Sequence, residues 1–99
     1  MFGHQLVSLC DRMIEVGLVD SREAFAIRYC NKARGYLGDL TRREGPAARI
    51  PPRTVGRIRH RLAEAAVARP DLAVETRALD AFIDQSLYVA NLLGRRGAR

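Results

Sequence analysis

The stretch 20–43, DSREAFAIRYCNKARGYLGDLTRR, decides the fold because it contains two short helical patterns separated by a break. Asp20 and Glu23 have the spacing of a capping box, in which the two residues satisfy free amide groups at a helix start. Asn31, a residue type that tolerates a positive φ, stands between the two patterns. The stretch therefore predicts two short helices joined by a tight turn at Cys30 and Asn31.

These two helices are predicted over about 21–30 and about 33–43. In the first, the residues expected to be buried to differing extents are Ala24 or Phe25, Ala26, Ile27 and Tyr29. In the second, the apolar side is formed by Tyr36, Leu37 and Leu40. Gly35 and Gly38 are unusual inside a helix, where each costs about 1 kcal/mol relative to alanine. Close approach of the backbone to a partner is one reason to keep them.

A further helix is expected on the N-terminal side, over 4–16. Its apolar residues recur at three- and four-residue spacing, at Leu6, Leu9, Cys10, Met13 and Val16. Gly17 follows as a plausible stop, because glycine adopts the left-handed conformation that ends many helices.

Two helices are expected on the C-terminal side, after a loop at 44–52. The first covers about 53–68, with Val55, Ile58 and Leu62 inward, and ends before Pro70. The second is a long pattern at 71–94 with a break considered near 74–76, and 95–99 reads as a frayed basic tail. With no strand pattern, we predict an all-α, compact four- to five-helix domain over 1–94, with a helix-turn-helix at about 21–43 and a long C-terminal helix.

Positive charge is concentrated in the middle of the chain. Residues 28–69 contain eleven basic and three acidic residues, whereas the remainder has a net charge of −2, for a total of +6. Sixteen of the seventeen basic residues are arginine, which a GC-rich genome would also produce, but codon preference does not explain the segregation. A basic segment on a small helical scaffold is typical of proteins that bind a phosphate backbone.

Segment 20–62 resembles the lambda-repressor-like helix-turn-helix family. The residues that carry the resemblance are Ser21-Arg22-Glu23, Phe25-Ala26, Tyr36-Leu37-x-x-Leu40, Glu44-Gly45, and Val55, Ile58 and Leu62 after the Pro-Pro pair. Cys30 and Asn31 stand where the family usually has glycine, and the spacing from Ala26 to Leu37 is one residue longer than is typical. The resemblance implies a DNA-binding regulator of transcription whose second motif helix enters the major groove.

The resemblance also implies roles for individual residues. Base contacts are expected from Arg34, Gly35 and Asp39. Phosphate contacts are expected from Lys32, Tyr36, Arg42, Arg43, Arg49, Arg53, Arg57 and Arg61. Three alternatives remain open: an ion pair of Asp39 with Arg42 or Arg43, a packed Tyr36, and a merely solvated stripe at Arg57 and Arg61.

Helix-turn-helix proteins usually act as two-fold dimers, and the apolar C-terminal helix is a candidate interface over 76–93. The interface residues expected there are Leu79, Phe82, Ile83, Leu87, Tyr88, Val89 and Leu92. The alternative is a helix that only completes the core.

No catalytic group of residues is recognisable, so we expect a protein that is not an enzyme, without metal or cofactor. His4, Cys10, Cys30 and His60 fit no zinc spacing, and the two cysteines are expected to be buried, reduced thiols. No apolar run approaches the roughly 18 residues of a membrane span, so the expected location is the cytoplasm, at the nucleoid. A module that binds an acidic protein such as RNA polymerase or another regulator is the main alternative; an RNA binder is weaker, since no aromatic platform is evident.

Overall fold

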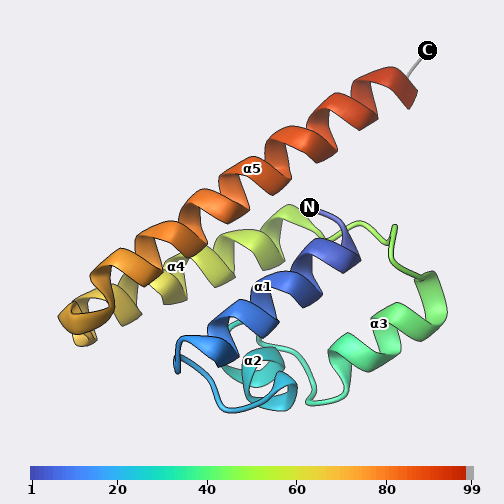
Figure 1. Cartoon of the computed structure of the whole chain (residues 1–99). Helices are drawn as coiled ribbons and strands as arrows, with labels where there is room; N and C mark the ends of the chain where they lie inside the picture. The colour runs from blue at the N-terminus through green and yellow to red at the C-terminus, as the bar shows by residue number, and fades with distance from the viewer. Residues whose placement is uncertain (98–99) are drawn as a thin grey trace.

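The computed structural model describes residues 1–97, with side chains described through Leu93, and it confirms an all-α fold. In chain order the elements are α1 (Gly3–Glu15), α2 (Arg22–Arg28), α3 (Tyr36–Glu44), α4 (Pro52–Ala68), the short 3-10 helix η1 (Pro70–Leu72) and α5 (Ala73–Gly97) (Figure 1). The described residues contain no strand; a single isolated bridge joins Phe2 to Arg49.

Helix α1 is the centre of the domain, because it packs against α2, α3 and α5 (Figure 1). Helices α4 and α5 form an antiparallel pair connected through η1, and α3 contacts α1 and α2. The largest fully buried side chains come from α1, α2 with the residues after it, α4 and α5: Leu6, Leu9, Cys10, Met13, Phe25, Cys30, Ile58 and Ile83. The outer side of α3 therefore stays clear of the long final helix.

The start of α1 is tied to the loop that precedes α4. The Gly3 amide donates to the carbonyl of Ala48 at 2.7 Å, and the Ile50 amide donates to the carbonyl of Met1 at 3.0 Å. Both Ala48 and Ile50 are buried. These bonds hold the start of α4 beside the N-terminus, where Pro51 precedes the helix and Pro52 is its first residue.

Helix α2 begins one residue later than the capping pattern predicted. Ser21, and not Asp20, is the N-cap, because its hydroxyl oxygen accepts a hydrogen bond from the Ala24 amide at 3.1 Å. The predicted burial of Phe25 and Ala26 is confirmed, but that of Ile27 is wrong, since Ile27 is 54% exposed. A seven-residue helix has only one buried side, and Ile27 lies off that side.

The connection between α2 and α3 is the largest departure from expectation. Seven residues, 29–35, separate the two helices, so the predicted tight turn is wrong. Tyr29 and Cys30 are buried, and Asn31 then takes the expected positive φ, at 55°. At Asn31 the positive φ turns the chain out of helix, and α3 starts at Tyr36 instead of about residue 33.

Helix α5 is continuous from Ala73, so the break considered near 74–76 is absent. The Thr76 hydroxyl bonds the carbonyls of Leu72 and Ala73 at 3.0 Å, which satisfies it within the helix. The helix also continues through Gly97 and not only to residue 94; of the expected basic tail, residues 98–99 lie outside the described residues.

The assignment of Leu79 and Ile83 to the interface is wrong, because both are buried in the core of a single copy. Phe82 and Leu87 are half-buried against the same core. Tyr88, Val89 and Leu92 remain exposed. Helix α5 has apolar residues on more than one side. Its sequence alone therefore does not indicate which side packs against the rest of the domain. No helix of the described part combines the length and apolarity needed to cross a membrane.

Candidate nucleic-acid interface

The basic residues of segment 28–69 divide into two groups according to their partners. Arg42, Arg59, Arg61 and Arg69 form ion pairs with carboxylates. Within the described part of the chain, no carboxylate pairs with Arg28, Lys32, Arg34, Arg43, Arg49, Arg53 or Arg57. All seven are exposed, so their charge is directed to solvent or to a partner.

Arg59 has a structural role. Its guanidinium bonds Asp80 at 2.9 Å and Asp84 at 2.8 Å, both on α5. These hydrogen bonds raise the pKa of Arg59 above its ordinary value. The side chain is also the most shielded of the paired arginines, and it ties α4 to α5 instead of facing a ligand.

A hollow between α2 and α4 collects two guanidinium groups. Arg28 of α2 and Arg61 of α4 line it together with Tyr29. Burial raises the pKa of the Tyr29 hydroxyl, and the charges of Arg28 and Arg61 oppose that rise, as expected for two cations close to one phenol. Arg57 and Arg53 precede Arg61 at four-residue intervals and continue the same side of α4. We call Arg28, Arg53, Arg57 and Arg61 the basic ridge.

A second hollow lies along α3. Lys32, Tyr36, Asp39 and Arg43 are among the residues that line it. The Lys32 ammonium lies 5.7 Å from the centre of the Tyr36 ring, within the range of a cation–π contact. Tyr36 itself is half-buried against the core, which confirms the alternative that it packs; its phosphate contact stays a prediction.

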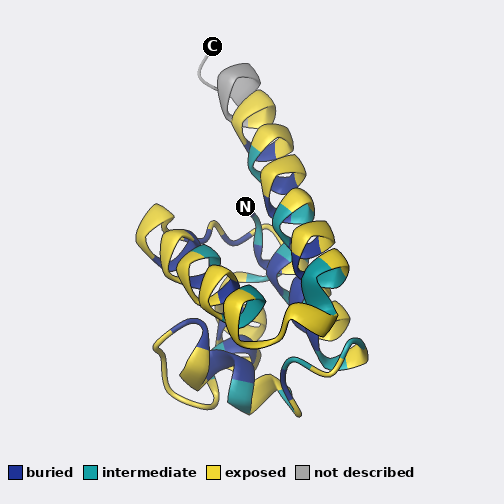
Figure 2. Ribbon diagram, turned by 90° about the vertical axis from the view of Figure 1, so that its left-hand side faces the viewer, coloured by how far each residue is buried: buried dark blue, intermediate teal, exposed yellow. Residues whose placement is uncertain are grey.

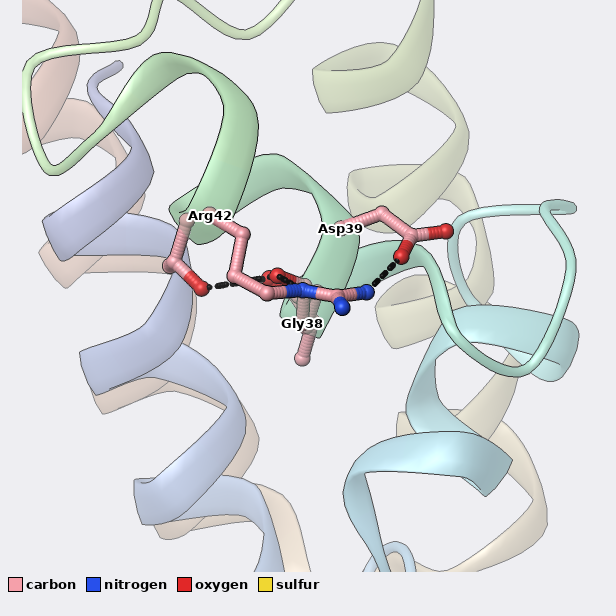
Figure 3. Close-up of polar contacts among 5 residues, drawn as sticks. Gly38, Asp39 and Arg42 are labelled. Carbon is pink, nitrogen blue, oxygen red and sulfur yellow. Dashed lines mark hydrogen bonds and ion pairs between the residues drawn. The ribbon is translucent and has the colours of Figure 1, made fainter.

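The outer side of α3 carries Gly38, Asp39 and Arg42 (Figure 3). The Arg42 guanidinium reaches across the helix, donating to the Gly38 carbonyl at 3.4 Å and pairing with Asp39. A Cβ built on Gly38 would meet nothing within 4 Å. The position of a Gly38 side chain is therefore open to a partner, whereas the Gly38 carbonyl is occupied by the Arg42 guanidinium.

The predicted base contacts are placed differently from what a helix at 33–43 implies. Gly35 is the N-cap of α3 and Arg34 lies before it, so neither projects from the helix. Asp39 pairs with Arg42, which confirms the alternative role left open for it. Among the predicted phosphate contacts, Arg61 pairs with Glu64 at 3.1 Å, and the Arg49 guanidinium lies 5.0 Å from the centre of the Phe2 ring.

Two residues of this surface were missed by the sequence patterns as site residues. Arg28 was not predicted as a site residue. Its position in the last turn of α2, where a cation also complements the helix dipole, is a signal that could have drawn attention to it. Gly38 was marked only as unusual; its place on the outer side of α3 follows from Leu37 and Leu40 facing inward.

The two cysteines are buried thiols, as expected. Burial raises the pKa of Cys10 to about 11 and that of Cys30 to about 12, so both thiols are protonated at neutral pH. Among the described residues, no three His, Cys, Asp or Glu side chains are grouped in a way that would hold a metal ion.

Comparisons of the chain with protein-family models, with curated proteins and with solved structures give no match.

Proposed function

We propose that this chain is a sequence-specific, double-stranded DNA-binding regulator of transcription that acts as a homodimer at the nucleoid. The observation that carries the proposal is the set of exposed cations without carboxylate partners on α2, the 29–35 connection, α3 and α4. Unneutralised guanidinium groups release counterions when they meet phosphates, and this release drives binding to duplex DNA.

The basic ridge is suited to a phosphate strand. Arg53 and Arg57 are spaced by one helical turn, about 6 Å along α4, and Arg61, which pairs with Glu64, follows one turn further on. Arg28 adds a second guanidinium beside Arg61 from a different helix. Such contacts position a protein on DNA without reading its sequence.

Sequence reading is proposed for the outer side of α3. Gly38 lets the backbone approach a base edge, and Arg42 is a candidate to fork onto guanine once it leaves Asp39. Arg34, before the helix, remains a candidate for a base edge or an adjacent phosphate. The connection between α2 and α3 is seven residues long, so we propose that α3 approaches the groove differently from the second helix of a tight helix-turn-helix.

Replacing Arg57 with alanine tests the phosphate role. We expect the affinity for a random duplex to fall about tenfold at 50 mM salt and the log–log salt slope to flatten by about one unit. Arg77→Ala is the matched control, because Arg77 is an exposed arginine on α5, outside the proposed surface. Fluorescence anisotropy with a labelled duplex measures both the affinity and the salt slope. If the wild-type chain does not bind duplex even at low salt, the proposal fails and an acidic protein partner becomes the better candidate.

Replacing Gly38 with alanine separates stability from binding. Alanine is favoured over glycine in a helix by about 1 kcal/mol, so the melting temperature should rise by roughly 4–8 °C. The added methyl group should hold α3 away from DNA and weaken binding about tenfold, or about 1.4 kcal/mol. Gly56→Ala in α4 is the control, because its Cβ also meets nothing within 4 Å. We expect it to stabilise the fold and leave DNA affinity unchanged; equal affinities for the two variants would contradict the assignment of α3.

A further inference from the structure

The side of α5 that faces away from the domain carries a regular row of residues. They follow one another at alternating intervals of four and three, the spacing of one continuous seam along a helix: Val74, Ala78, Ala81, Gln85, Tyr88 and Leu92. All are exposed, and Val74 and Tyr88 are 73% and 64% exposed. We call this row the outer stripe.

The outer stripe lies opposite the residues that join α5 to its own domain. Thr76, Leu79, Ile83, Ser86 and Ala90 are buried and occupy the inner side. Figure 2 shows exposed residues along the outer edge of α5 over its described length. The main elements that contact α5 are α1, α4 and η1, and the residues that α5 buries lie on its inner side.

The outer stripe itself contains no charged residue, although 28% of the chain is charged; the exposed Arg77 and Asp84 flank it along one edge. An outward helix face in such a protein normally carries several charges. A strongly acidic partner would find no counter-charge along this row. Two copies of a chain with net charge +6 repel each other. This repulsion is smallest where the surfaces in contact carry no charge.

We propose that the outer stripe is a homodimer interface in which two copies of α5 pack antiparallel about a two-fold axis near residue 83. In this register Tyr88 packs over Ala78 of the second copy, Leu92 over Val74, and Gln85 beside Ala81. Each large side chain thus faces a small or medium one, and the two helices keep an even separation along the seam. A parallel pairing would place alanine against alanine and tyrosine against tyrosine, which leaves gaps at one end.

The charges beside the stripe are compatible with this pairing. Asp84 flanks the seam close to the axis, so the two copies of Asp84 come near each other. Each is paired with its own Arg59 at 2.8 Å, which offsets the repulsion between the carboxylates. The ion pair that ties α4 to α5 therefore also prepares the flank of the interface.

The size of the stripe indicates a weak dimer. From Val74 to Leu92 it is about 27 Å long at 1.5 Å per residue. A helix pair of this length covers roughly 500 Å² per copy, below the typical 800 Å² of a stable complex. We expect a dissociation constant of about 10–100 µM without DNA, with two DNA-bound copies associating more readily because DNA holds them together.

Sedimentation velocity of the full chain without DNA, from about 5 to 200 µM, tests the interface. We expect the wild-type chain to shift from monomer to dimer over this range, and Ala81→Glu to remain monomeric because two carboxylates enter the centre of the seam. Val67→Glu, at the 84% exposed Val67 of α4, is the control and should dimerise normally. A monomeric wild-type chain at 200 µM, or a dimer of Ala81→Glu, would overturn the proposal.

Cross-linking tests the orientation. Antiparallel packing places Val74 of one copy near Leu92 of the other and separates the two copies of Val74 by about 27 Å, far beyond the 4.4–6.8 Å between Cα atoms in a disulfide. A mixture of the single variants Val74→Cys and Leu92→Cys should therefore form mixed disulfide dimers. Each variant alone should not, and the buried Cys10 and Cys30 do not compete. Self-cross-linking of Val74→Cys would refute the antiparallel arrangement.

This inference deepens the dimer of the proposed function but is measured without DNA. A failed dimer test with intact duplex binding would leave a monomeric DNA-binding protein. A dimer that binds no duplex would overturn the DNA-binding proposal alone.

Discussion

Raising the salt concentration from 50 to 200 mM is expected to weaken binding to a random duplex about a thousandfold. Six phosphate contacts give a log–log slope near −5, and a fourfold rise in salt at that slope corresponds to a factor of about 1,000. The six side chains proposed for these contacts are Arg28, Lys32, Arg34, Arg43, Arg53 and Arg57, none of which pairs with a described carboxylate. Anisotropy titrations over a series of salt concentrations measure the slope.

The triple variant of Arg28, Arg53 and Arg57 to alanine should remove half of these contacts. Its log–log slope should be about −2.7, because the three remaining phosphate contacts contribute about −0.9 each. A wild-type slope shallower than about −2 would contradict the proposed surface. Binding to an acidic protein through a few rim charges would give such a shallow dependence.

Replacing Phe25 with alanine is expected to lower the free energy of unfolding by about 3–5 kcal/mol. Phe25 is fully buried and its ring stacks on Tyr29 with the centroids 5.9 Å apart. A domain of this size has a stability of about 5–10 kcal/mol, so the variant loses a large share of it. Urea unfolding followed by circular dichroism measures the change.

Ile27→Ala is the neighbouring control for this prediction. Ile27 is 54% exposed, so its removal should cost less than about 1 kcal/mol. Similar losses for the two variants would mean that α2 is not packed as described. Because seven residues do not form a stable helix alone, loosening Phe25 should also displace Arg28, and DNA binding should weaken with it.

Helices that are long and strongly periodic were predicted closely. The expected span 4–16 differs from α1 by one residue at each end, and 53–68 differs from α4 by one residue at its start, because their apolar residues recur with the helical period. Gly17, with φ at 86°, follows the end of α1 as expected. These are local effects, which depend on residues within a few positions of one another.

The connection between α2 and α3 was not predictable in this way. Tyr29 and Cys30 continue the helical pattern of α2, yet they are buried after the helix has ended at Arg28, and α3 starts only at Tyr36. Similarly, the interface prediction selected the large apolar residues of α5, among which Leu79 and Ile83 belong to the core. The sequence alone does not say which side of α5 meets α1 and α4.

The candidate site shows the same division. Segregation of positive charge into residues 28–69 is a property of the sequence, and so are the all-helical class and the stops at Gly17 and Pro70. Which arginines are free for a ligand was decided by the tertiary structure, since Arg59 is neutralised by Asp80 and Asp84, more than twenty positions away. Backbone preference and periodicity act over a few residues, whereas ion pairing and burial depend on where whole helices pack.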